Sequence, residues 1–398
     1  MTDFDTLQDR SQSASEKWDK VGMLEHFGRE DLLPFWVADM DFKAPPSVSE
    51  SLVERAENGI YGYEVRRDSL SDAITDWFSR RHHWTIDQSH ICFSHGIMNA
   101  LTMLINMHTE EGDGIIIQPP VFFEFRLAII ENRRKVIRNP LKREGERYQM
   151  DFNDLEKQAA DPRNKILILC NPHNPVGRVW EKEELQRLGE ICRQHNVLVI
   201  ADEIHGDIVY PGHQYIPFAS ISDEDAQNSF SCLSPAKTFN IASVTEATII
   251  IPDEEYRKQY KQFAFKYFID KPGAFTVVAM EAAYRNGEDW LDQVLDYLHE
   301  NLNYLRSFLK DRIPKVKLVE PEGTFLVWLD FRELGLETKE LEQFIAQKGR
   351  LALNSGYWFG RQGAGYARMT IACPRSRLEE GLTRLEQAID GLSVKGDG

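Results

Sequence analysis

One lysine of the chain has neighbours that suit a nucleophilic amine. Lys237 lies in the stretch 231–240 between small and hydroxyl residues, and the apolar run 247–251 follows it. A lysine amine that is removed from water has a lowered pKa and can attack a carbonyl carbon. Spacing alone favours an ordinary solvated lysine, so the chemistry of Lys237 depends on the polar residues that the fold brings beside it.

Two upstream stretches supply such polar residues. Residues 171–177 read Asn-Pro-His-Asn-Pro-Val-Gly, and residues 201–205 read Ala-Asp-Glu-Ile-His. Each comes after an apolar run of strand length. Ligands of a parallel sheet bind at the carboxyl ends of its strands. We therefore expect Asn174 and Asp202 to lie beside a ligand at that edge.

With Lys237, these stretches resemble the fold-type I enzymes of pyridoxal 5'-phosphate (PLP), the aspartate-aminotransferase superfamily. The resemblance implies that Lys237 forms a Schiff base with PLP and that Asp202 pairs with the pyridinium nitrogen. It also implies that Asn174 binds the ring 3-oxygen and that His205 lies near it, where many aminotransferases have a tyrosine. A carboxylate at the pyridinium keeps that nitrogen protonated, which lets the ring act as an electron sink.

The same resemblance implies the residues that bind the cofactor phosphate. A short strand at 91–93, small residues and then a helix start present backbone N–H groups to a phosphate. We expect Gly96 and Ile97 to bind it through the backbone and Ser234 through its hydroxyl. Tyr63 matches a tyrosine that reaches the partner subunit's cofactor, which implies a homodimer with shared active sites. The alternative for Tyr63 is a buried tyrosine in a turn.

Further stretches resemble one branch of the superfamily, the MalY/PatB-type C–S lyases, or cystathionine β-lyases. They are Lys-Trp-Asp at 17–19, Ala-Asp-Met-Asp-Phe at 38–42, Asp-Glu-Ile-His at 202–205 and Pro-Glu-Gly-Thr-Phe at 321–325. In that branch the N-terminal arm lies beside the substrate pocket, which implies that Asp39 binds substrate. Arg368 matches the arginine that clamps the substrate α-carboxylate, a task for a planar and permanently charged guanidinium.

Four features depart from the pattern of this branch. His95 stands where the branch usually has proline. Phe122 matches the aromatic residue, commonly tyrosine, that stacks on PLP. Its ring can still stack, but it lacks the tyrosine hydroxyl. The alternative is that Phe122 is simply a core residue. Glu246 is an unexpected carboxylate, either solvated at the surface or tuning the pocket against anionic substrates. Residues 265–275, expected to line the partner's site, also fit the branch poorly.

Length and the order of elements predict the architecture. A chain of 398 residues with 42% hydrophobic content is long enough for a large core and two domains. From residue 165 strands alternate with helices, which predicts a mostly parallel central sheet. We expect an α/β protein with the type I PLP-dependent transferase fold. Its parts would be an arm at 1–45 that contributes to the small domain and the substrate pocket, a large PLP-binding domain at 46–288 and a smaller α+β domain at 289–398.

Composition argues against several classes of partner. The net charge of −16 disfavours nucleic acid, and the longest apolar runs have the length of strands rather than of membrane spans. The N-terminus is acidic and lacks the apolar core of a signal peptide. The five cysteines form no Cys-x-x-Cys pair, which disfavours a disulfide framework or a metal site. We expect a cytoplasmic enzyme that acts on a small amino acid.

The expected reaction is a β-elimination. Once displaced from the cofactor, the amine of Lys237 removes the α-proton of an L-amino acid, and a thiolate leaves from the β-carbon. The products from L-cystathionine or a related cysteine S-conjugate are pyruvate, ammonia and a thiol. Three alternatives stay open: an aminotransferase built from the same residues, a specialised biosynthetic C–S lyase, and a regulator that binds a transcription factor through an exposed apolar patch.

Overall fold

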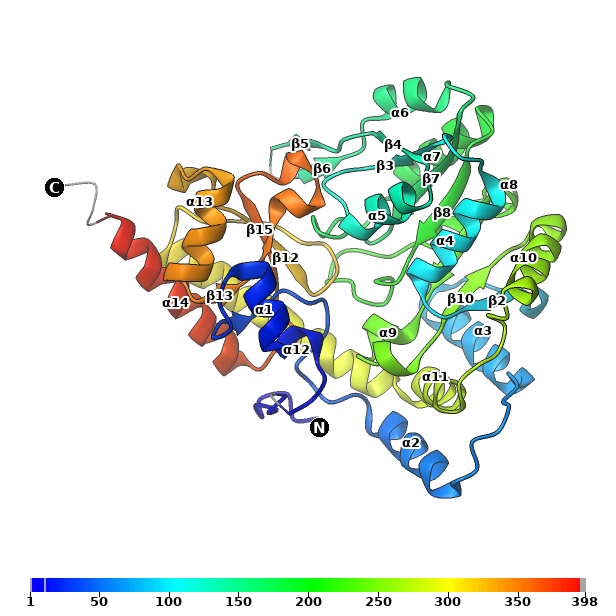
Figure 1. Cartoon of the computed structure of the whole chain (residues 1–398), viewed down its shortest axis with the longest axis horizontal. Coiled ribbons are helices and arrows are strands. Elements are labelled where there is room, and N and C mark those ends of the chain that lie inside the picture. Colours follow the sequence, from blue (N-terminus) through cyan, green and yellow to red (C-terminus); the bar gives the residue numbers. More distant parts are fainter. Residues whose placement is uncertain (1, 11, 146, 394–398) are drawn as a thin grey trace.

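The computed structural model describes residues 2–10, 12–145 and 147–393, and a seven-stranded sheet lies at its centre (Figure 1). The strand order is β2-β10-β9-β8-β7-β3-β4; the neighbours from β9 to β4 are parallel, and β10 is antiparallel to both β2 and β9. The strands are β2 (Ile91–Ser94), β3 (Gly114–Ile117), β4 (Lys135–Arg138), β7 (Asn164–Cys170), β8 (Leu198–Asp202), β9 (Ser229–Leu233) and β10 (Ala247–Ile250). The prediction of a mostly parallel sheet is confirmed.

Helices cover both faces of this sheet, and strand β7 shows why. Ile166 and Ile168 pack into a core with α4, α5 and α10, whereas Leu167 and Leu169 pack into another core with α6 and α7. Successive side chains of a strand point to opposite faces, so a continuous apolar run indicates burial on both. The helices are α4 (Ile97–His108), α5 (Phe123–Glu131), α6 (Phe152–Ala159), α7 (Lys182–Gln194), α8 (Asp223–Gln227) and α10 (Glu254–Lys266).

A second, antiparallel sheet lies toward the C-terminus, with the order β11-β12-β15-β14. Arg368 lies on β15, an inner strand of this sheet. The elements of this part are α12 (Glu288–Arg312), β11 (Lys317–Val319), β12 (Leu326–Asp330), α13 (Thr338–Gln343), β14 (Asn354–Ser355), β15 (Tyr366–Thr370) and α14 (Arg375–Ser393).

The helical region before the C-terminal sheet consists of two helices, α11 (Ala274–Asn286) and α12. Gly287 separates them, and a Cβ atom there would lie 2.5 Å from the carbonyl oxygen of Ala283 and from the ring of Phe239. α11 packs against α2 (Pro46–Asn58) and α3 (Asp68–His82). No helix within the described ranges has both the length and the apolar character that crossing a membrane requires.

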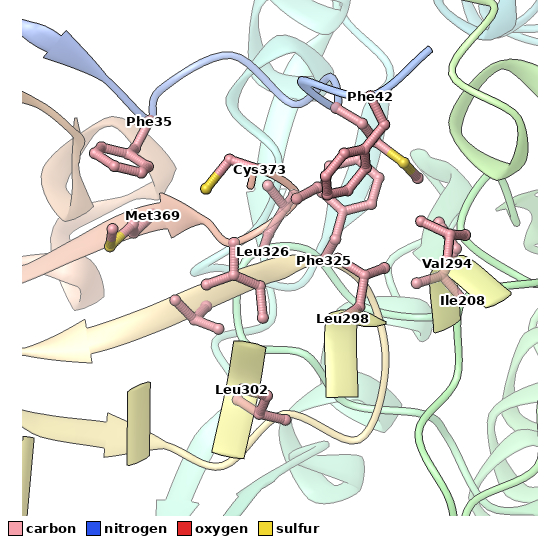
Figure 2. Close-up of a cluster of buried hydrophobic side chains, with 14 of the residues drawn as sticks. Phe35, Phe42, Ile208, Val294, Leu298, Leu302, Phe325, Leu326, Met369 and Cys373 are labelled. Atoms are coloured by element: carbon pink, nitrogen blue, oxygen red, sulfur yellow. The ribbon is translucent and has the colours of Figure 1, made fainter. Parts of the chain in front are cut away.

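The N-terminal arm lies against the C-terminal part of the chain (Figure 1). After α1 (Lys20–Phe27), strand β1 (Leu33–Pro34) pairs in parallel with β13 (Leu351–Ala352). Figure 2 shows Phe35 and Phe42 of the arm in one buried cluster with residues of β12, β15 and α12. The predicted boundaries at 45 and 288 stay a prediction, and residues 394–398 of the predicted C-terminal domain lie outside the described residues.

Buried charges also hold the arm. Lys17 is fully buried, and its ammonium lies 3.1 Å from Asp41 Oδ2 and 3.3 Å from Asp39 Oδ1. Arg10 pairs with Asp39 at 2.7 Å and with Asp41 at 2.9 Å. Burial would raise the pKa of Asp41, but Lys17 and Arg10 hold it below its usual value. The Lys-Trp-Asp stretch therefore contributes a structural ion pair.

Replacing Lys17 is expected to destabilise the arm, because it leaves Asp41 buried beside a single cation. We expect Lys17→Met to lower the free energy of unfolding by about 3 kcal/mol. Lys20 is exposed in the following turn, and Lys20→Met should change it by less than about 0.5 kcal/mol. Urea denaturation of both variants measures the difference; equal stabilities would show that the buried pair contributes nothing.

Candidate active site

A cavity of about 400 Å³ opens at the carboxyl ends of the central strands, between the large sheet, the arm and the C-terminal sheet. It brings together most of the residues that the sequence singled out. Those that line it are Gly96, Ile97, Phe122, Asn174, Asp202, His205, Ser234, Lys237 and Arg368, together with His95 and Glu246. Asp39 and Tyr63 do not line it.

Lys237 enters this cavity from α9 (Pro235–Thr238), which follows β9 directly. Ser234 caps the helix by accepting a hydrogen bond from the backbone N–H of Ala236 at 3.3 Å. The amine of Lys237 donates to the carbonyl oxygen of Ala38 at 2.6 Å. Burial lowers the pKa of Lys237, although the carboxylate of Asp39 opposes this effect. The amine is therefore more readily available in its neutral, nucleophilic form.

A buried carboxylate behind α9 fixes the position of Lys237. Asp207 accepts hydrogen bonds from Thr238 Oγ1 at 2.7 Å and from Trp77 Nε1 at 3.0 Å, and it lies 2.7 Å from His82 Nε2. Burial would raise the pKa of Asp207, but the bonds from His82 and Thr238 keep it low. Sequence reasoning missed this residue because its partners come from α3 and α9, far apart in the chain.

Asp202 ends strand β8 with its side chain in the cavity wall. Its Oδ1 accepts a hydrogen bond from the N–H of Ile204 at 3.3 Å. Burial raises the pKa of Asp202 to about 7, and Lys237 only partly offsets this. Among the described residues no cation forms an ion pair with it. A cationic ring nitrogen placed here would supply that missing charge, so Asp202 fits the predicted cofactor.

His205 gives independent evidence that the cavity accepts a polar ligand. Its side chain is 3% exposed, and Nδ1 has no hydrogen-bond partner in the part of the chain that the structure describes. Burial lowers the pKa of His205 to about 3, helped by Lys237 and Arg368, so the ring is neutral. A buried polar atom without a partner is costly unless a ligand satisfies it.

Arg368 is a buried cation held by neutral acceptors. Its guanidinium donates to Asn354 Oδ1 at 2.7 and 3.1 Å, to the carbonyl oxygen of Trp36 at 2.8 Å and to Asn174 Oδ1 at 3.1 Å. Burial lowers the pKa of Arg368 to about 9. Within the described residues no carboxylate pairs with it. Arg368 is therefore held in a fixed orientation without a counter-charge among the described residues. A substrate carboxylate would supply that charge.

Asn174 follows a strand end and connects two parts of the site. Its Oδ1 accepts from Arg368, and its backbone N–H faces the sulfur of Cys170 at 3.4 Å. The side-chain Nδ2 has no partner among the described residues and remains for a ligand oxygen. The predicted role of Asn174 beside a ring oxygen is compatible with this arrangement.

The other end of the cavity contains the predicted phosphate-binding residues. Gly96 precedes α4 with φ 134° and ψ 165°, a conformation that glycine adopts readily, and Ile97 begins the helix. Backbone N–H groups at such a helix start attract an anion. The hydroxyl of Ser234 donates to the carbonyl oxygen of Glu246 at 3.0 Å. His95 also lines this end.

Glu246 is not the solvated surface residue that was one of its two interpretations. Its side chain is buried and pairs with Arg66 in a two-pronged ion pair, with N–O distances of 2.9 and 3.1 Å. The same arginine donates to the carbonyl oxygen of Asp270 at 2.5 Å and stacks on Phe93. Sequence reasoning could not find this pair, since Arg66 lies 180 residues earlier in the chain.

Two predicted site residues lie outside the cavity of their own chain. Tyr63 is fully exposed, which contradicts the alternative of a buried tyrosine. Exposed apolar side chains lie in the same loop and in the poorly fitting stretch 265–275. Together they are here called the exposed patch: Ile60, Tyr61, Tyr63, Val65, Phe265, Tyr267 and Phe268. Asp39 pairs with Arg10 and Lys17, so its carboxylate is already engaged.

Several residues of the cavity wall were missed from the sequence, and four of them have side chains that bear on binding. They are Glu16, Trp36, Glu124 and Asn354. Glu16 directly precedes the Lys-Trp-Asp stretch, so the motif gave a positional signal for it. Asn354 lies on the short strand β14 and carried no signal, because only the pairing of β14 with β15 brings it to Arg368.

Comparison with known proteins identifies the family. The sequence profile of aminotransferase class I and II matches residues 30–385. Cystathionine β-lyase PatB of Bacillus subtilis is 42% identical over 97% of this chain and 99% of its own length, and protein MalY of Escherichia coli is 34% identical over 98% and 99%. The crystal structure of a PLP-bound putative aminotransferase from Clostridium difficile is 45% identical, with a TM-score of 0.95 over 98% of this chain and 100% of that one. The chain therefore belongs to the class I and II aminotransferase family, with the fold-type I architecture and the MalY/PatB relationship that its motifs predicted.

Proposed function

We propose that this protein is a PLP-dependent C–S β-lyase that converts L-cystathionine or a related cysteine S-conjugate to pyruvate, ammonia and a thiol. The observation that carries the proposal is that one cavity contains both a desolvated amine, Lys237, and a buried guanidinium, Arg368, which has no carboxylate partner among the described residues. The name of the relative PatB, a cystathionine β-lyase, supports the choice of C–S bond cleavage within the family.

Arg368 binds and orients the substrate. A carboxylate can accept two parallel hydrogen bonds from a guanidinium, which fixes its plane as well as its position. Asn354 and the carbonyl oxygen of Trp36 keep the guanidinium in place. The α-carbon of the bound amino acid then faces the amine of Lys237, which takes the α-proton as a general base.

The polar residues of the cavity hold the cofactor. When bound, PLP supplies an electron-withdrawing ring that stabilises negative charge at the α-carbon. Asp202 would pair with the ring nitrogen, and Asn174 and His205 would bind the ring oxygen. Gly96, Ile97 and Ser234 would bind the phosphate, and Phe122 would cover one ring face. Phe122 has no hydroxyl and therefore offers no proton to the leaving sulfur.

A homodimer with shared active sites is part of the proposal. The exposed patch includes the fully exposed Tyr63, and leaving so many apolar side chains in water costs free energy. A second copy that covers the patch would bring Tyr63 to the phosphate end of its neighbour's cavity. The five cysteines, all buried and free, support a location in a reducing compartment such as the cytoplasm.

The reaction type is tested by pyruvate release from L-cystathionine without any added keto acid. We expect steady release by the wild-type protein and loss of at least about a thousandfold in Lys237→Ala, which removes both the base and the attachment point of the cofactor. Lys310→Ala, at an exposed position of α12, is the control and should match the wild type. Turnover only with an added keto acid would instead establish an aminotransferase.

The carboxylate clamp is tested by Arg368→Lys, which keeps a positive charge and removes the planar fork. We expect KM to rise about 30-fold with a smaller change in kcat, because hydrogen bonds between charged groups contribute about 1.5–3 kcal/mol. The control is Arg361→Lys, an exposed position outside the cavity. An unchanged KM in Arg368→Lys would remove Arg368 from substrate binding.

Shared active sites are tested by mixing inactive subunits. Refolded mixtures of Tyr63→Ala and Lys237→Ala chains contain heterodimers with one intact site, so activity should recover to about a quarter of the wild-type value. Lys237→Ala mixed with Arg368→Ala is the control. Both of these groups lie in one chain's cavity, so no intact site forms and activity should not return. Equal behaviour of the two mixtures would contradict a contribution of Tyr63 across the interface.

A further inference from the structure

Two carboxylates in the cavity wall have no task in the proposed reaction. Glu16 comes from the helical turn Glu16–Trp18 of the arm, and Glu124 from the first turn of α5. Glu124 is half-buried. In the described parts of the chain, neither carboxylate forms a hydrogen bond or an ion pair with another side chain. Such groups are available to a ligand.

Glu124 lies within electrostatic reach of the reacting groups. Burial raises its pKa, Glu16 raises it further, and Lys237 and Arg368 act in the opposite direction. Glu124 in turn acts on the pKa of both of these cations. In the described part of the chain no direct ion pair joins Glu124 to Lys237 or Arg368, so its carboxylate stays available to a ligand.

The direction of the bound substrate follows from the rest of the cavity. Under the proposed function, Arg368 takes the α-carboxylate and the α-carbon lies beside Lys237. The phosphate end, at Gly96 and Ser234, is occupied by the cofactor. Part of the remaining wall belongs to the arm and to the start of α5, and the inference places the group attached to sulfur against this part.

This part of the wall combines aromatic surface with negative charge. Trp36, which is buried, and Phe123, which is half-buried, present apolar faces, and Glu16 and Glu124 present the carboxylates. Aromatic faces and carboxylates both attract a cation, whereas an anionic group would be repelled here. The unpartnered Nδ1 of His205 and the carboxylate-free Arg368 show separately that polar ligand groups belong in this cavity.

We propose that Glu124, assisted by Glu16, selects cysteine conjugates whose sulfur substituent carries a positive charge. The proposal rests on the proposed lyase function and names the substrate class of that site. The preferred substituent ends in an amine or another cation.

The first test compares three conjugates of similar size with the holoenzyme: S-(2-aminoethyl)-, S-propyl- and S-(2-carboxyethyl)-L-cysteine. Pyruvate release should give the highest kcat/KM for the aminoethyl conjugate and the lowest for the carboxyethyl conjugate. In Glu124→Gln the ratio of the aminoethyl to the propyl value should fall about tenfold. Glu131→Gln, an exposed carboxylate at the other end of α5, is the control and should keep the wild-type ratio.

A binding measurement separates this inference from the reaction itself. L-Lysine has the shape of S-(2-aminoethyl)-L-cysteine but no sulfur leaving group, and L-norleucine lacks its terminal charge. Calorimetry with the holoenzyme should show tighter binding of L-lysine, and Glu124→Gln should remove the difference. Cleavage of the propyl conjugate, with no preference for the aminoethyl conjugate or for L-lysine, would overturn the inference. It would leave the lyase function standing. Tighter binding of L-lysine without release of pyruvate from any conjugate would support the inference and overturn the lyase.

Discussion

The site depends on buried charges that lack counter-charges of their own. Arg368 and Asp202 lie in one cavity with Lys237, and neutral backbone and amide groups hold the arginine where an ion pair would ordinarily be expected. Leaving such groups buried costs free energy, so the surrounding structure must be rigid enough to keep them in place. A ligand that brings a carboxylate and a cationic ring recovers that free energy on binding.

The N-terminal arm supplies much of this rigidity. Its backbone carbonyls accept hydrogen bonds from both cations, that of Trp36 from Arg368 and that of Ala38 from Lys237. Lys17 precedes these contacts in the chain and Asp41 follows them, so their buried ion pair fixes the arm on both sides of the contacts. The arm therefore connects the stability of the C-terminal sheet to the geometry of the reacting groups, and an aspartate that the sequence assigned to substrate, Asp39, belongs to this support.

The sequence was sufficient where function depends on short stretches at strand ends. Asn174, Asp202 and Lys237 each follow a strand of one parallel sheet, so their meeting at one edge could be predicted from local pattern and family resemblance together. Pairings between distant segments could not be predicted in this way. Glu246 with Arg66, Asp207 with Thr238 and His82, and Asn354 with Arg368 each depend on how separate elements pack, which no local pattern encodes. The position of Glu124 in the cavity was not predicted for the same reason, because it is set by the fold and not by a motif.

The central claim is that Lys237 is the amine that holds the cofactor in this desolvated cavity. Borohydride reduction of the PLP-loaded protein, followed by proteolysis and mass spectrometry of the peptides, tests it most directly because reduction makes the lysine–cofactor bond permanent. We expect a phosphopyridoxyl group on the peptide that contains Lys237 and on no other lysine. The same group on a different lysine, or on none, would contradict the account.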